Sequence, residues 1–97
     1  MFDAGSHRVR GVWLDGRSYP CLGGNLLVVY RPSNAGDNDG DWELIVKLAD
    51  PPALEQRVYD VAMRLADDRM ASGLAGVVRV VGCDVVLRGA GAITATA

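Results

Sequence analysis

Between positions 42 and 48, every second residue is hydrophobic, and the residues between them are mostly polar. One set comprises Trp42, Leu44, Val46 and Leu48, and the other comprises Glu43, Ile45 and Lys47. Because successive side chains of a strand point to opposite faces of a sheet, this period of two predicts a strand whose first set faces the core. This is the clearest strand signal in the chain.

Residues 51–71 have a different spacing, which predicts a helix. Apolar residues recur there at intervals of three and four, in the stripe Leu54, Val58, Val61, Ala62, Leu65 and Ala66. Asp50 followed by Pro51 suits a helix N-terminus, because proline at the first helical position loses only a donor that would stay unpaired. Gly73 suits a helix stop. We expect one amphipathic helix here, packed on a sheet.

Short β-prone segments flank the expected helix on both sides. They cover residues 9–14, 17–22 and 25–31 before it, and residues 76–81 and 84–88 after it. Tight turns at Asp15-Gly16 and Gly23-Gly24 should make the first three strands a meander, and Gly82-Cys83 should join the last two. Pro20 lacks a ladder donor and should interrupt the second strand.

The expected fold is a single α+β domain over residues 1–97. It holds a mainly antiparallel sheet of five to seven strands, or a partial barrel, with one helix packed on it in the order β-β-β-β-α-β-β. Residues 33–41 are expected to form a flexible loop, and residues 89–97 an edge strand or tail. The chain is too short for a second domain.

Two segments, 26–29 and 77–81, are apolar at odd and even positions alike. Strands with this composition are usually covered on both faces. One helix covers only one face of a sheet. The other face should therefore meet either a curled part of the same sheet, as in a small barrel, or another subunit.

The charge balance does not favour any class of partner. Ten basic and twelve acidic residues give a net charge of −2, which provides no field to attract nucleic acid or anionic lipid. No apolar run reaches the roughly 18 residues of a membrane span, and the first residues lack the pattern of a secretion signal. We expect a cytoplasmic protein that does not bind membranes.

Residue types that carry catalysis or bind metals do not form a recognisable motif. The acidic residues Asp37, Asp39, Asp41 and Glu43 partly match a calcium-binding loop. With Gly40 in the sixth position, however, the first and twelfth would be Ala35 and Val46, which cannot ligate a cation. His7 is the only histidine, and Cys21 and Cys83 lack an evident activating base in the sequence. We expect no cofactor, no metal and no enzymatic activity.

The leading functional hypothesis is a non-catalytic interaction or structural module that self-associates through its sheet. It follows from the absence of catalytic motifs and from apolar strand surface in excess of what one helix covers. The expected interface consists of Val77, Val78, Val80, Val85, Leu87 and Ile93.

Two alternatives remain open. The first is a small-molecule-binding domain or small enzyme with a pocket between helix and sheet, lined by Trp13, Tyr30, Trp42 and Tyr59. The second is an arginine-dependent nucleic-acid binder. It would use Arg8, Arg10, Arg79 and Arg88, provided that the first strand and the last hairpin are neighbours.

Overall fold

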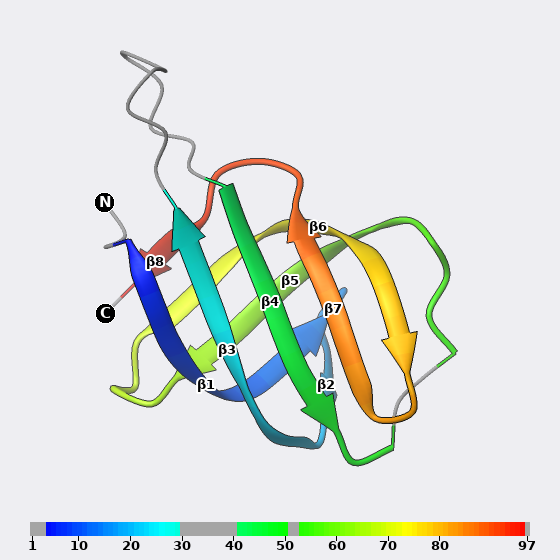
Figure 1. Cartoon of the computed structure of the whole chain (residues 1–97). Coiled ribbons are helices and arrows are strands. Elements are labelled where there is room, and N and C mark those ends of the chain that lie inside the picture. The colour runs from blue at the N-terminus through cyan, green and yellow to red at the C-terminus, as the bar shows by residue number, and fades with distance from the viewer. Residues whose placement is uncertain (1–3, 30–40, 51–52, 97) are drawn as a thin grey trace.

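The computed structural model describes residues 4–29, 41–50 and 53–96, and these form an antiparallel β-barrel. The strands are β1 (Gly5–Leu14), β2 (Arg17–Tyr19), β3 (Cys21–Val29), β4 (Asp41–Leu48), β5 (Val58–Leu65), β6 (Met70–Val81), β7 (Asp84–Gly89) and β8 (Thr94–Thr96). The order β1-β3-β4-β7-β6-β5 closes on itself, because β5 also pairs with β1. In Figure 1, β3, β4 and β7 run side by side across the front, and β5 and β6 cross behind them.

Two short strands lie outside this closed ring of six. β2 pairs with the C-terminal part of β1, and β8 pairs with the N-terminal part of β6. The tail predicted as an edge strand thus forms β8 within its own chain.

The α+β expectation is wrong, because the described residues contain no helix and are all-β. The segment predicted to be helical holds β5 and the first residues of β6. Tyr59, Val61, Met63 and Leu65 are buried in the barrel, and the outward positions between them are Asp60, Ala62 and Arg64. The pair Val61 and Leu65 fits a period of two as well as a helical spacing of four. Ladders to β1 and β6 on its two edges determine that the segment is a strand.

The predicted meander of the first three strands is also wrong. The turn at Asp15-Gly16 is confirmed, with φ angles of 52° and 80°. The chain does not turn again at Gly23-Gly24, however, since both glycines lie within β3. β2 and β3 instead both pair antiparallel with β1, and the predicted interruption at Pro20 separates them.

Other sequence-based predictions are confirmed. In β4, Trp42, Leu44, Val46 and Leu48 are buried, as the alternation indicates. The turn between β6 and β7 lies at Gly82-Cys83, and Gly82 has a φ of 58°. Of the two ways to cover a second face of the sheet, the structure shows the curled sheet of a barrel. Most of the predicted loop 33–41 lies outside the described residues.

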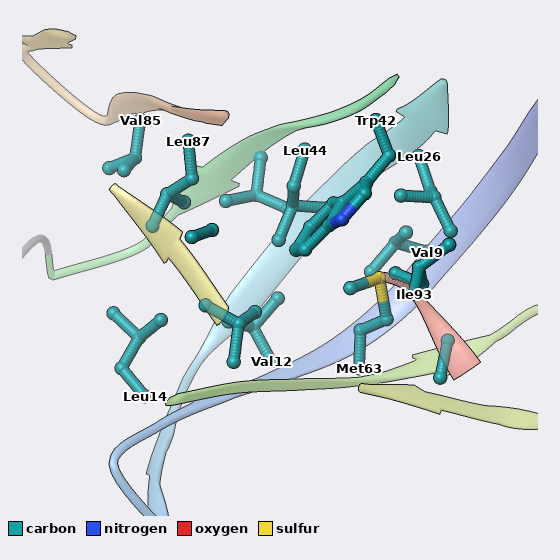
Figure 2. Packing of buried hydrophobic residues seen from close by; sticks show 14 of the residues in the cluster. Val9, Val12, Leu14, Leu26, Trp42, Leu44, Met63, Val85, Leu87 and Ile93 are labelled. Atoms are coloured by element: carbon teal, nitrogen blue, oxygen red, sulfur yellow. The ribbon is translucent and has the colours of Figure 1, made fainter. Parts of the chain in front are cut away.

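The barrel interior is filled by apolar side chains around Trp42 (Figure 2). The indole Nε1 donates a hydrogen bond of 2.8 Å to the carbonyl oxygen of Gly91. Gly73 and Gly89 lie so close that a Cβ at either position would come within 3 Å of the indole. The chain leading into β8 therefore closes this end of the barrel, and two glycines make room for the ring.

Candidate functional site

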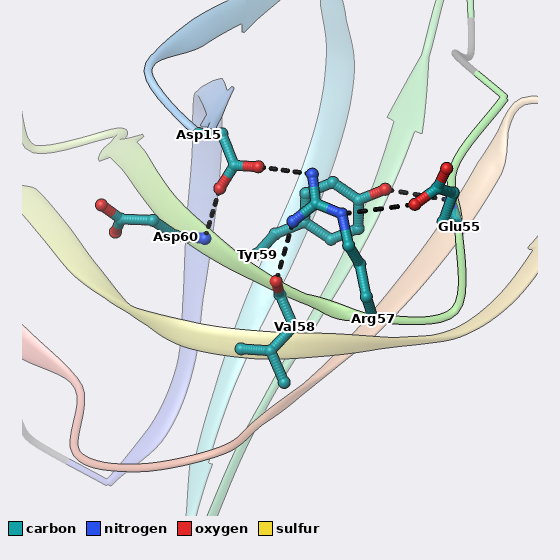
Figure 3. A network of polar contacts seen from close by, with 6 residues as sticks. All are labelled: Asp15, Glu55, Arg57, Val58, Tyr59 and Asp60. Atoms are coloured by element: carbon teal, nitrogen blue, oxygen red, sulfur yellow. Dashed lines mark hydrogen bonds and ion pairs between the residues drawn. The ribbon is translucent and has the colours of Figure 1, made fainter.

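A polar network joins the β1–β2 turn to the segment that leads into β5 (Figure 3). The Arg57 guanidinium lies 3.8 Å from the ring centroid of Tyr59 and donates a 2.6 Å hydrogen bond to Asp15 Oδ2. Asp15 Oδ1 accepts a hydrogen bond from the Asp60 backbone N–H. The Tyr59 hydroxyl accepts one from the Glu55 backbone N–H. Each of these groups has a partner within the network. The network therefore holds the β1–β2 turn against β5.

Hydrogen bonds in this network favour the charged state of its central pair. The bond from the Asp60 backbone N–H, followed by the bond from Arg57, lowers the pKa of the Asp15 carboxyl below its ordinary value. The hydrogen bond to Asp15 raises the pKa of Arg57. Both shifts stabilise an ion pair, and neither poises a group for proton transfer near neutral pH.

The pocket predicted from aromatic residues is not assembled. Trp42 and Tyr59 are buried in the core, whereas Trp13 lies on the outside of β1, where its ring covers Gly11. Tyr30 lies outside the described residues. The expected site between helix and sheet also lacks its helix, since β5 occupies that segment.

The residues of the predicted interface divide between the core and the surface. Val85, Leu87 and Ile93 are buried in the barrel, and Val77 is partly buried against it. Only Val78 and Val80 are exposed, at 47% and 39%. These six residues therefore do not make one continuous outer surface.

A continuous outer surface does occur on β3, β4 and β7, and we call it the β4 face. It comprises Leu27, Glu43, Ile45, Lys47, Asp84, Val86 and Arg88. Cross-strand pairing aligns the strands in three rows: Leu27 with Glu43 and Arg88, Asn25 with Ile45 and Val86, and Gly23 with Lys47 and Asp84.

The middle row of the β4 face is apolar on β4 and β7, where it consists of Ile45 and Val86, and ends in Asn25 on β3. The two outer rows each carry opposite charges side by side on β4 and β7. Ile45 is 39% exposed, and Leu27 is 38% exposed. Glu43 and Arg88 form an ion pair of 3.7 Å. The alternation of residues 42–48 places Ile45 outward, so a large apolar residue at an outward position was the available sequence signal. That Leu27 and Val86 belong to the same face as Ile45 follows only from the strand register, which cannot be read from the sequence.

The four arginines considered for nucleic-acid binding fall into two groups. Arg8 and Arg10 lie on β1, and Arg79 and Arg88 lie on β6 and β7. β3 and β4 separate β1 from β7 around the barrel. The first strand and the last hairpin are therefore not neighbours, as that hypothesis required.

Residue types that bind metals are also dispersed. Within the described residues, no group of three or more histidine, cysteine or acidic side chains could hold a metal ion. Asp37 and Asp39 of the acidic segment lie outside the described ranges. Cys21 and Cys83 are free thiols. Strand β4 separates them, since Cys21 is paired with Leu48, whose N–H donates to the carbonyl oxygen of Cys83.

No helix in the described part of the chain is long and apolar enough to cross a membrane. Comparison of the chain with protein-family models, with curated proteins and with solved structures found no match.

Proposed function

We propose that the protein is a non-catalytic interaction module that self-associates as a two-fold dimer through the β4 face. The observation that carries this proposal is the arrangement of that face on β4 and β7, with the apolar pair Ile45 and Val86 between two rows of opposite charges. An interface that joins two copies by a two-fold axis must be complementary to itself, because the same residues come from both sides.

The β4 face meets this condition. Two directions of the axis are possible. An axis that lies in the interface plane, perpendicular to β4 at Ile45, stacks Ile45 on its copy and places Glu43 opposite Lys47 of the second chain. An axis parallel to the strands, between β4 and β7, places Glu43 opposite Arg88 instead. Opposite charges meet in both arrangements, and the apolar pair Ile45 and Val86 is buried in both. Complementary charges fix orientation, whereas burial of Leu27, Ile45 and Val86 supplies most of the binding free energy.

The barrel interior offers no competing site among the described residues. Every fully buried side chain there is apolar, and a catalytic pocket needs converging polar groups. This supports a protein that works through its outer surface.

Sedimentation equilibrium of the full chain, from low micromolar to millimolar concentration, tests the proposal. The natural sequence should reach twice its mass of 10.3 kDa. Ile45→Asp should raise the dimer dissociation constant at least about tenfold, or about 1.4 kcal/mol, because each dimer then buries two unpaired carboxylates.

Val58→Asp is the matched control. Val58 is also an exposed apolar residue of a strand, but it lies on β5, across the barrel from β4. It should leave the dissociation constant within about twofold, since it introduces the same charge outside the interface. A chain that stays monomeric at millimolar concentration, or equal effects of both substitutions, would contradict the proposed interface.

A further inference from the structure

The ladder between β1 and its neighbours is interrupted on the side opposite β5. Pairing of β1 with β3 ends at Val9 and Gly24, and pairing of β1 with β2 begins at Val12 and Tyr19. The register of β3 against β4 shifts between Cys21 and Gly23. The strands therefore spread apart here, and we call the resulting depression the β1–β3 hollow.

The β1–β3 hollow has a volume of about 540 Å³. Its lining consists of Arg8, Val9, Arg10, Cys21, Leu22, Gly23, Gly24 and Asn25. A volume of this size falls within the range of small-molecule sites, which is about 300–1,000 Å³. The lining residues include two arginines and no acidic residue, so the charge of the hollow favours anions.

The two arginines are available to a ligand. Arg8 forms no ion pair with any residue in the described ranges. Arg10 forms an ion pair of 3.4 Å with Asp68, in which both side chains are more than half exposed. Exposed pairs of this kind contribute at most about 1 kcal/mol, because solvent screens them. A bound anion can therefore replace Asp68 at little cost.

The other wall of the hollow supplies neutral groups and fixed backbone. Asn25, directly opposite Arg8 in the β1–β3 ladder, carries a side-chain amide donor. Gly23 has a φ of 142°, a conformation that favours glycine. A Cβ at Gly24 would lie 2.5 Å from the Ile45 carbonyl oxygen, so this position needs glycine to pack on β4. At Gly23 a Cβ would have no atom within 4 Å, so the backbone there is open to a ligand.

We propose that the β1–β3 hollow binds a phosphate group, held between the guanidinium groups of Arg8 and Arg10. Guanidinium groups match phosphate oxygens with two parallel hydrogen bonds, which makes arginine a suitable residue for this anion. The hollow borders the β4 face, because Asn25 of its lining pairs with Ile45, whereas Arg8 and Arg10 lie on β1, outside that face. Phosphate binding by the two arginines therefore does not require self-association. Free oligophosphate and the phosphate of an organic ester share this chemistry.

Titration with pyrophosphate at low ionic strength, followed by two-dimensional NMR of the backbone amides, tests the site. In the natural sequence, the largest shifts should fall on residues 8–10 and 21–25. Arg8→Gln and Arg10→Gln should each weaken binding at least about fivefold, because each removes one charged donor pair. Arg79→Gln is the matched control, since it removes the same charge from an exposed position on β6. It should weaken binding less than about twofold.

Unchanged amide spectra outside the hollow will show that the variants remain folded.

A parallel titration with adenosine diphosphate identifies the source of the phosphate. Tighter binding than pyrophosphate indicates an organic ester, and equal or weaker binding indicates free oligophosphate. The site does not exist if pyrophosphate shifts no amides of the hollow, or if Arg79→Gln weakens binding as much as Arg8→Gln does.

Discussion

Replacing Gly89 by alanine should destabilise the barrel through a single contact. A Cβ at this position would lie 2.2 Å from Nε1 of Trp42, whereas atoms in favourable contact are about 3.5–4.0 Å apart. The indole is 2% exposed and is held by its hydrogen bond to Gly91, so it cannot turn into solvent. Overpacking usually costs about 1–3 kcal/mol, and the depth of this overlap places Gly89→Ala near the upper value.

Gly76 provides the matched control for this substitution. It lies in β6 opposite Arg88 of β7, and a Cβ there would have no atom within 4 Å. Gly76→Ala should stabilise the protein by about 0.4–1 kcal/mol, because alanine restricts the unfolded chain. In urea melts at one protein concentration, with a slope of about 1–1.5 kcal/mol per molar, Gly89→Ala should lower the midpoint by about 2–3 M.

A double variant tests whether the indole is the cause. Trp42→Val removes Nε1, Cδ1 and Cε2 of the ring, the three atoms that the new methyl group would strike. In that background, Gly89→Ala should cost at least about 1 kcal/mol less than in the natural sequence. Equal midpoints for the two glycine variants, or additive costs in the double variant, would refute the packing argument.

Three further substitutions test other parts of the structure. Val61→Asp should cost about 4 kcal/mol or more in a urea melt, because Val61 is fully buried in β5, whereas Asp60→Ala should cost little; equal midpoints would show that Val61 does not face the core. The lowered pKa of Asp15 means that its contribution to stability is complete above the ordinary value of 3.8 and is lost as pH falls through the lowered value. Asp15→Asn should therefore be less stable than the natural sequence at neutral pH and converge with it in acid; a gap that is the same at all pH values would exclude the ion pair as its cause. Truncation after Gly89 removes buried Ile93 and the hydrogen-bond acceptor of Trp42, so it should cost about 3–5 kcal/mol; a truncated chain with an unchanged thermal midpoint would show that this segment does not close the barrel.

Local patterns predicted the strands that have one polar face and missed the strand that fits two patterns. In β4, only one arrangement puts Trp42 and Leu44 in the core, so the sequence determines which face is buried. In β5, Val61 and Leu65 fit both a strand and a helix, and a good helix-opening sequence at Asp50-Pro51 favoured the wrong one. The deciding contacts are with β1 and β6. These depend on chain closure and leave no local signal.

The same limit applies to the candidate sites. Val85, Val86 and Leu87 are all apolar, so their sequence does not reveal that Val86 is the one that points outward. The β1–β3 hollow depends on a register shift in β3, which brings Gly23 and Gly24 beside Arg8 and Arg10. Sequence spacing predicted Gly23-Gly24 as a turn, because adjacent glycines suit turns as well as irregular strands.

Closure of the barrel between β1 and β5 also bears on how the chain folds during synthesis. Val12 pairs with Met63, 51 positions further along the chain, and such distant contacts form slowly, typically in milliseconds to seconds. Until β5 has left the ribosome, β1 can pair only along the edge that it shares with β2 and β3. A nascent or prematurely terminated chain therefore presents an open strand edge, where another chain can add. Completion of β5 pairs that edge, but the outer edges of β4 and β5 stay open until β6 and β7 join them. The ring therefore closes, and its last open edges disappear, only when the chain has been made as far as Gly89.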